Sequence, residues 1–208
     1  MGGAIAARLR REDWGVVAVG RAGGDLATAS GARGVVADAV ERLGGLDLVV
    51  HAAGDGFVPR PVAEVTEEDW DAAAGATAKG TFFLAQAAAP HLESSRGAIV
   101  VVTDVAAYQP WPSFAPHCAA KAAQAMLVRV LARALAPAVR VCGVAPGTVA
   151  VDPELEPRRA AESVLGRTGS PDDVAAAVSY LAGASFVTGT TLVVDGGRLL
   201  KTGAGDPP

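Results

Sequence analysis

Three side chains that can carry protons stand close together in the middle of the chain: Asp104, His117 and Lys121. Asp104 follows an apolar run, and a carboxylate just past a buried strand lies where open parallel sheets bind their ligands. His117 and Lys121 are four residues apart, on one face of a helix. Imidazole exchanges protons near neutral pH. The pattern predicts a proton-transfer site. Each residue also has a structural alternative: a turn-capping aspartate, a polar histidine at a helix start, or a solvated lysine.

The elements that must position these groups can be predicted from periodicity. Valine-rich apolar runs indicate buried parallel strands at residues 14–20, 46–51, 98–102, 139–144 and 190–194. Helical spacing occupies residues 3–11, 34–44, 67–91, 119–135 and 172–181, with a break near 75–80 in the third. This alternation predicts an α/β fold, a parallel sheet covered on both faces and joined by right-handed crossovers. We expect one domain over residues 1–200 and a flexible tail over 201–208.

Composition narrows the classes of function. The chain has 208 residues and a net charge of -4, and no basic run favours nucleic acid or an anionic membrane. The three histidines lack metal-ligand spacing, and the two cysteines do not form a disulfide framework. No apolar run is long enough to cross a bilayer. We therefore expect a cytoplasmic protein without a metal site, membrane contact or nucleic-acid partner.

Several motifs together resemble the short-chain dehydrogenase/reductase family. They are LDLVVHAAG (46–54), GAIVVVTD (97–104), VRVCGVAPG (139–147), GRTGSPDDVAAAVSYLAG (166–183) and FVTGTTLVVDGG (186–197). The resemblance implies a Rossmann-like doubly wound sheet, an NAD(P)-dependent oxidoreductase, a small-molecule substrate and a homo-oligomer. The family places Ser, Tyr and Lys where this chain has Asp104, His117 and Lys121. Asp104, together with Trp14-Gly15, is most similar to the pteridine-reductase-like branch.

The amino-terminal third departs from the family pattern. The family begins with a strand and a glycine loop, TGxxxGxG, whereas Met1-Gly2-Gly3 matches only the last glycine and the helix after it. Most of a helix-strand unit between Arg21 and Gly34 is also absent. Unpaired buried backbone is costly, so three explanations stay open. The start lies upstream of Met1, the chain is a degraded copy, or the sheet has closed across the gap.

The resemblance also implies which residues hold a cofactor. Arg21 resembles the residue that binds the 2'-phosphate of NADP, and guanidinium pairs well with phosphate. No acidic residue stands at that strand end, so we expect NADP rather than NAD. Asp25 is either a remnant of the adenine-contacting turn or an exposed loop residue. The other expected cofactor contacts are Gly2, Ala53, Gly54, Lys121, Pro146, Gly147 and Thr148. His51 and Thr77 stand where the family has Asn, and we expect His51 to be structural.

Three functions remain open from the sequence. The first is NADPH-linked reduction of a carbonyl or pterin-like molecule by Asp104, His117 and Lys121, with altered activity. In that case Trp111 and Phe57 line a pocket for a flat ring, and the alternative is that both pack in the core. The second is a non-catalytic relative that uses residues 172–194 as an oligomer interface. The third is a cofactor-independent lyase or isomerase in which His117 acts as the base.

Overall fold

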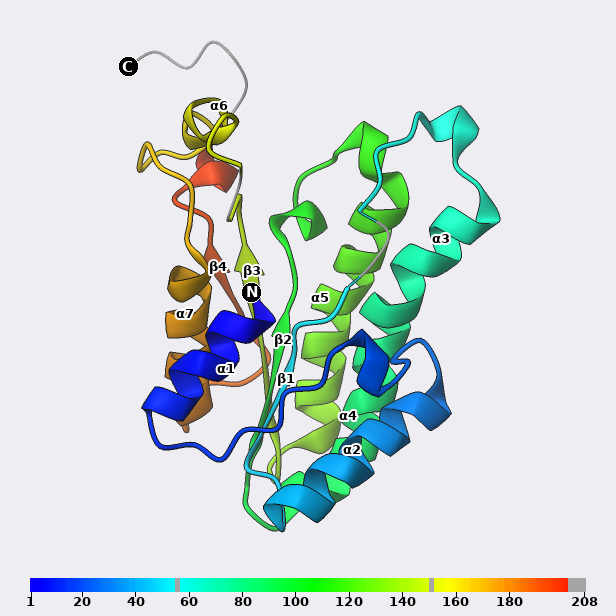
Figure 1. Cartoon of the computed structure of the whole chain (residues 1–208), viewed down its shortest axis with the longest axis vertical. Coiled ribbons are helices and arrows are strands. Elements are labelled where there is room, and N and C mark those ends of the chain that lie inside the picture. The colour runs from blue at the N-terminus through cyan, green and yellow to red at the C-terminus, as the bar shows by residue number, and fades with distance from the viewer. Residues whose placement is uncertain (55–56, 150–151, 202–208) are drawn as a thin grey trace.

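A computed structural model describes residues 1–54, 57–149 and 152–201. Within this part of the chain, four strands form one parallel sheet in the order β1-β2-β3-β4. They are β1 (Leu48–His51), β2 (Ala98–Val102), β3 (Arg140–Pro146) and β4 (Thr191–Val194). The predicted α/β fold with a parallel sheet is therefore confirmed (Figure 1).

Helices cover both faces of this sheet (Figure 1). One face carries α1 (Gly2–Arg11) and α7 (Pro171–Gly183). The other carries α2 (Ala29–Leu43), α4 (Gly80–Glu93) and α5 (Ala115–Leu135), with α3 (Glu67–Ala74) beside α5. The short α6 (Glu156–Ala160) follows β3. Short 3-10 helices include η1 (Arg21–Gly23), η4 (Val105–Ala107) and η5 (Pro112–Phe114).

Strand β2 shows how the two cores are built. Its side chains alternate, as a pleated strand requires. Ile99 and Val101 enter the core under α4 and α5, while Val100 and Val102 enter the core under α1 and α7. All five residues of β2 are buried, which explains why the strand reads as a continuous apolar run. The carboxyl end of this central strand leads directly to Asp104.

Local signals explain where several helices begin. Ser170 caps α7 through a reciprocal capping box with Asp173, and a proline occupies the first turn. Thr66 and Asp69 cap α3 in the same way. The predicted break near 75–80 is a π-helical turn, η3 (Gly75–Lys79), that joins α3 to α4. None of the helices in the described ranges is long and apolar enough to cross a membrane.

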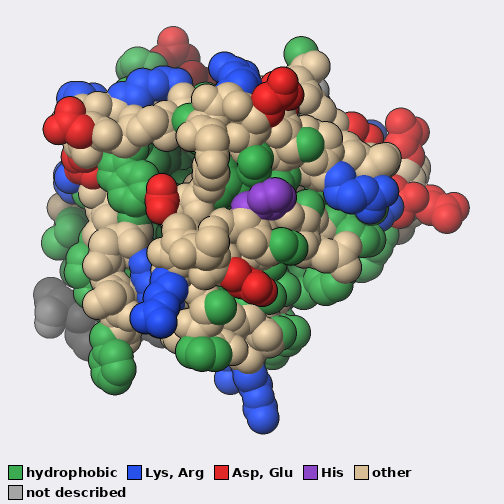
Figure 2. All heavy atoms as spheres, turned by 90° about the horizontal axis from the view of Figure 1, so that it is seen from below, with side chains coloured by type: hydrophobic (Ala, Val, Ile, Leu, Met, Phe, Trp, Pro, Cys, Tyr) green, Lys and Arg blue, Asp and Glu red, His purple; other side chains and the backbone are tan. Residues whose placement is uncertain are grey.

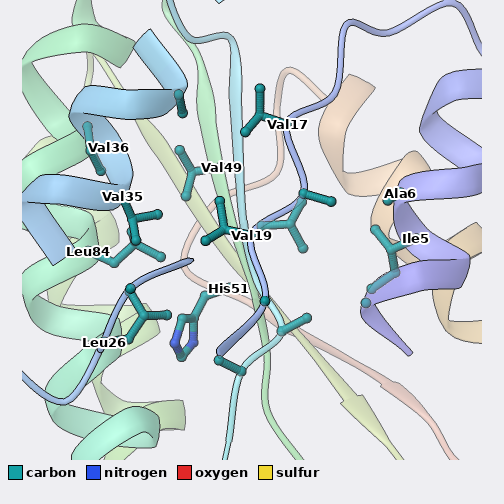
Figure 3. A pocket seen from close by; sticks show the side chains of 18 of the residues that line it. Ile5, Ala6, Val17, Val19, Leu26, Val35, Val36, Val49, His51 and Leu84 are labelled. Atoms are coloured by element: carbon teal, nitrogen blue, oxygen red, sulfur yellow. The ribbon is translucent and has the colours of Figure 1, made fainter. Parts of the chain in front are cut away.

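The predicted strand at residues 14–20 is wrong. This segment pairs with no strand, and its described backbone contacts are at its ends. A strand requires a hydrogen-bonding neighbour, and this segment is separated from β1 by a cavity of about 810 Å³. The cavity lies between apolar side chains of both segments (Figure 3). The explanation that the sheet has closed across the gap is therefore contradicted as well.

Candidate functional site

Asp104 follows β2 at the carboxyl edge of the sheet and uses its two oxygens differently. Oδ1 accepts a hydrogen bond from Ala106 N at 2.8 Å and caps η4. Oδ2 lies 3.6 Å from His117 Nε2. The turn-capping alternative is thus correct for one oxygen, while the other faces the imidazole. One carboxylate therefore both shapes its loop and faces a group that can exchange protons.

His117 lies in the first turn of α5, and its side chain is only 8% exposed. Neither ring nitrogen has a hydrogen-bond partner among the described residues. The 3.6 Å approach to Asp104 is longer than a hydrogen bond. Buried polar atoms without partners are unusual and costly. The imidazole therefore has capacity for a hydrogen bond to a bound molecule.

Aromatic rings surround His117. The Phe57 ring meets the imidazole edge-on, with centroids 4.9 Å apart. Trp111 lies nearly parallel to it, at 6.4 Å and 6°. Phe114 stacks on Phe57 at 4.5 Å, and the Arg198 guanidinium lies 5.0 Å from the Trp111 ring centroid. The predicted pair Phe57 and Trp111 is therefore brought together around His117, with Phe114 as a third member that sequence reasoning missed.

Lys121 lies one helical turn after His117, but its ammonium group points to the end of β2. Nζ donates to the carbonyls of Val102 (3.3 Å) and Thr103 (3.2 Å), and to Gln124 Oε1 (3.0 Å). Burial lowers the pKa of Lys121 to about 8, and the Asp104 carboxylate opposes that shift. The lysine is therefore a buried, hydrogen-bonded group and not a solvated one.

Sequence reasoning missed the buried network that holds this lysine. Gln124 Nε2 donates to Thr81 Oγ1 at 2.8 Å and lies 3.2 Å from His51 Nδ1. Thr81 in turn donates to the Thr77 carbonyl at 2.8 Å. Burial, and then the charge of Lys121, lower the pKa of His51 to about 4, opposed by the Ala76 carbonyl. The sequence does contain one signal for this network. Gln124 is a polar residue among alanines, three positions after Lys121, and therefore on the same side of the helix.

The expected cofactor residues fall into two groups. Gly2, Asp25, Ala53 and Gly54 all line the cavity beside β1. Pro146, Gly147 and Thr148 lie at the end of β3, and Arg21 begins η1 after the extended segment.

Two of these residues already have partners within the protein. Asp25 accepts a hydrogen bond from Ala27 N at 2.9 Å, so it shapes its own turn. Thr148 is bound by Arg198 and donates to Glu162 at 3.3 Å.

The residues present fit the nicotinamide cofactor that the resemblance implies. Helix α1 has no side-chain cap, and its first intrahelical bond starts at Ala4, so the amides of Gly2 and Gly3 have no described partner. A Cβ on Gly3 would meet nothing within 4 Å. A helix start of this kind binds phosphate. A Cβ on Gly54 would lie 3.9 Å from Lys121 Nζ, so a ligand close to that backbone would also reach the lysine.

Comparisons with known proteins agree with this architecture. A family model described as Enoyl-(Acyl carrier protein) reductase matches residues 5–198. The inactive 2-(S)-hydroxypropyl-CoM dehydrogenase 2 of Xanthobacter autotrophicus is 38% identical, covering 92% of this chain and 87% of that protein. Human dehydrogenase/reductase SDR family member 4 is 35% identical over 78% of this chain, which spans only 63% of that protein.

Solved structures show the same likeness. A short-chain dehydrogenase/reductase from Brucella melitensis, of the glucose/ribitol dehydrogenase type, has a TM-score of 0.77 and 35% identity, covering 84% of this chain and 73% of its own. The Thermoplasma acidophilum aldohexose dehydrogenase has a TM-score of 0.91 over 100% of this chain and 92% of its own, and at 24% identity it supports the fold alone. These matches, with the sheet and its motifs, show that the chain belongs to the short-chain dehydrogenase/reductase family of oxidoreductases.

Proposed function

We propose that this protein is an NADPH-linked reductase of a carbonyl or pterin-like small molecule. The observation that carries the proposal is the pair Asp104–His117, 3.6 Å apart at the carboxyl edge of the sheet and enclosed by aromatic rings. Phe57 and Trp111 offer apolar surfaces to a flat ring. Asp104 in place of Ser supports the pteridine-reductase-like branch.

In the proposed reaction, His117 stands in the position of the family's tyrosine. Its Nε2 or Nδ1, neither of which has a hydrogen-bond partner in the described ranges, hydrogen-bonds the substrate oxygen and gives it a proton as the carbonyl is reduced. Asp104 Oδ2 orients the imidazole from 3.6 Å. Lys121 carries a positive charge behind this pair, held by the carbonyls of Val102 and Thr103. The aromatic rings of Phe57 and Trp111 lie against the imidazole, whose side chain is only 8% exposed.

The cofactor contacts in this proposal are the amides of Gly2 and Gly3, the backbone of Ala53 and Gly54, and the turn Pro146–Gly147–Thr148. A nicotinamide cofactor, when bound, supplies the hydride. Arg21, next to the extended segment, supports the preference for the 2'-phosphate of NADP. We also propose that residues 1–200 form one domain, that the protein is a cytoplasmic homo-oligomer, and that residues 201–208 are a flexible tail; of these, 202–208 lie outside the described residues.

A second candidate function is that of a non-catalytic relative. The Xanthobacter protein in the comparison is named an inactive dehydrogenase. In this chain Lys121 Nζ already has three hydrogen-bond acceptors, all of them its own protein's oxygens. Both observations favour a protein that keeps the fold while its chemistry is weakened.

The test measures binding and turnover separately. NADPH should quench tryptophan fluorescence more strongly than NADH, and NADPH should be consumed when a quinonoid dihydropterin or an aromatic aldehyde is added. His117→Ala should lower turnover by about 100-fold or more, with binding unchanged. The matched control is His91→Ala, because His91 is an exposed histidine on α4 and should leave both readouts unchanged.

His117→Tyr separates the candidates. In the proposed reductase, a phenol at this position should raise NADPH-dependent turnover by about tenfold. If both the unmodified protein and the His117→Tyr variant bind NADPH but neither turns it over, the result supports the proposal of a non-catalytic relative. Cofactor-independent turnover that His117→Ala abolishes would replace the reductase with a lyase or isomerase.

A further inference from the structure

Arg198 follows the last strand of the sheet and has no part in the chemistry proposed above. It begins η6 (Arg198–Leu200), which comes after β4 and a short turn. The turn is fixed by Asp195, whose Oδ1 accepts from Gly197 N and whose Oδ2 accepts from Leu199 N, both at 2.8 Å. Gly197 has a φ of 81°, a conformation that favours glycine. The Arg198 side chain therefore leaves the backbone from a well-defined place.

The Arg198 guanidinium joins three other segments of the chain. Nε donates to Gln109 Oε1 at 3.3 Å, between η4 and η5. Nη1 lies 2.7 Å from Glu162 Oε2, beyond α6, and donates to Thr148 Oγ1, after β3. The side chain is only 16% exposed. Arginine carries its donors in a fixed planar fork, so one side chain can bridge acceptors that come from separate loops.

The charge of Arg198 is already matched within the protein. Glu162 Oε2 is its partner, and Glu162 Oε1 also pairs with Arg159 Nη1 at 2.8 Å. An ion pair that is largely withdrawn from water is costly to break by removing one partner. Arg198 is therefore better suited to hold neighbouring groups in place than to attract an anionic substrate.

The group that Arg198 holds is the Trp111 ring. The guanidinium carbon lies 5.0 Å from the ring centroid, which is within the range of a cation–π contact. Gln109, bound by Nε, stands shortly before Trp111 in the same loop, so the arginine fixes both the ring and its backbone. The Trp111 ring in turn lies 6.4 Å from the His117 imidazole, with only 6° between their planes. The wall beside His117 thus depends on a residue that is remote in the sequence.

The aromatic neighbours of Trp111 do not replace this support. Its ring meets those of Phe57 and Phe114 edge-on, with centroid distances of 6.4 Å and 6.2 Å. Phe57 is itself 59% exposed. These contacts join loop residues to one another, whereas Arg198 connects Trp111 to the end of β4 and, through Thr148, to the end of β3.

We propose that Arg198 is a positioning residue, which holds the Trp111 ring parallel to the His117 imidazole as a fixed wall of the substrate site. A wall that is already ordered favours a flat, ring-containing substrate, because stacking on it costs little further ordering. The predicted effect on turnover rests on the proposed reductase function. The position of the Trp111 ring does not, and it can be measured without turnover.

The first test follows the ring itself. Trp14→Phe and Trp70→Phe leave Trp111 as the only tryptophan in the chain. In this background Arg198→Met should lower the fluorescence anisotropy of Trp111 and raise its acrylamide quenching constant by about twofold or more. The matched control is Arg159→Met, which removes a pairing with the same carboxylate but no described contact with Trp111, and it should change neither readout.

The second test measures NADPH turnover of an aromatic aldehyde and of an aliphatic aldehyde with the same number of carbons. Arg198→Met should raise KM for the aromatic aldehyde by about fivefold, with kcat within about twofold and the aliphatic aldehyde unaffected. In a Trp111→Leu protein, Arg198→Met should raise KM no further, because the arginine acts through that ring.

Arg198→Lys guards against a variant that merely fails to fold, because it keeps a positive charge beside Glu162. A single ammonium group cannot reproduce the fork between Glu162 and Gln109, so the anisotropy of Trp111 should fall as in Arg198→Met. Unchanged anisotropy in both variants would overturn the proposal. An equal rise in KM for both aldehydes would also overturn it, since a general defect would explain the loss. If anisotropy falls but neither aldehyde is reduced by any form of the protein, the reductase function fails while the support of Trp111 by Arg198 stands.

Discussion

His117 and Asp104 reach each other from different elements, a helix start and a strand end. Neither imidazole nitrogen has a hydrogen-bond partner in the part of the chain that the structure describes, whereas Lys121 has three acceptors. His117, which we propose stands in the position of the family's tyrosine, is therefore the group with spare hydrogen-bonding capacity. Lys121 instead belongs to a buried network through Gln124, Thr81 and His51 that the protein itself completes.

Replacing Gln124 tests this network. Gln124→Leu removes one acceptor from Lys121 and the donors to Thr81 and His51, all in a fully buried place. We expect the free energy of unfolding in urea to fall by about 1–3 kcal/mol. Met126→Leu, on the exposed side of the same helix, should change it by less than about 0.5 kcal/mol. Equal stability of both variants would show that the network contributes nothing to folding.

At the scale of elements, segment 14–20 and strand β1 have the same kind of sequence but different structures. Both are short, apolar and rich in valine, and only β1 has a neighbour to pair with. Strands β3 and β4, in contrast, do pair, and they approach so closely at Gly143 that a larger side chain there would collide with β4. A Cβ there would lie 2.5 Å from Thr191 Oγ1 and 3.1 Å from its Cγ2. This glycine lets the last strand complete the sheet.

Two glycine replacements should therefore act in opposite directions. Gly143→Ala forces Thr191 away from its register and should lower the free energy of unfolding by about 1–3 kcal/mol. Gly34→Ala lies inside α2, where a Cβ meets nothing within 4 Å, and should raise it by about 0.5–1 kcal/mol. Thermal or urea unfolding checks both. A loss of stability in Gly34→Ala would contradict the explanation.

At the scale of the whole molecule, the sheet has helices on both sides (Figure 1). The residues expected to do chemistry lie at or near the carboxyl ends of its strands. Acidic and basic side chains are interspersed on the face shown in Figure 2, in keeping with the small net charge of -4. No group of three possible metal ligands occurs in the portion of the chain that is described. The buried imidazole of His51 titrates inside the fold, and it couples the stability of the whole molecule to pH.

His51 makes folding sensitive to acid. Its pKa is about 4 in the folded protein against 6.5 ordinarily, because of burial and then the charge of Lys121. Between these values the unfolded chain binds the extra proton and the folded chain does not, so stability falls as pH falls through this window. The loss should be about 3 kcal/mol. His51→Asn should flatten that part of the profile, as measured by urea unfolding from pH 7 to pH 4. An unchanged slope would assign the acid sensitivity to another group.

Much of this architecture could be predicted from the sequence because its signals are local. Buried strands such as β2 read as apolar runs, and capping residues such as Ser170 mark helix starts. Chain order and strand ends then predict that Asp104 and the start of α5 lie on one edge of the sheet. These local facts predict that Asp104 and His117 belong to one site, and in the structure Asp104 Oδ2 lies 3.6 Å from His117 Nε2.

Other features depend on contacts between distant parts of the chain. Segment 14–20 has the composition of a strand, yet a strand exists only where another backbone supplies the ladder, and β1 lies across a cavity. The direction of Lys121 depends on Val102, Thr103 and Gln124 as competing acceptors, and the low pKa of His51 depends on burial by several elements. Residue types and periodicity by themselves determined the layers of this protein and the set of reactive groups. Only tertiary structure decided which backbone edges are paired and which side chains are free to bind a substrate, because both depend on partners that are remote in the sequence.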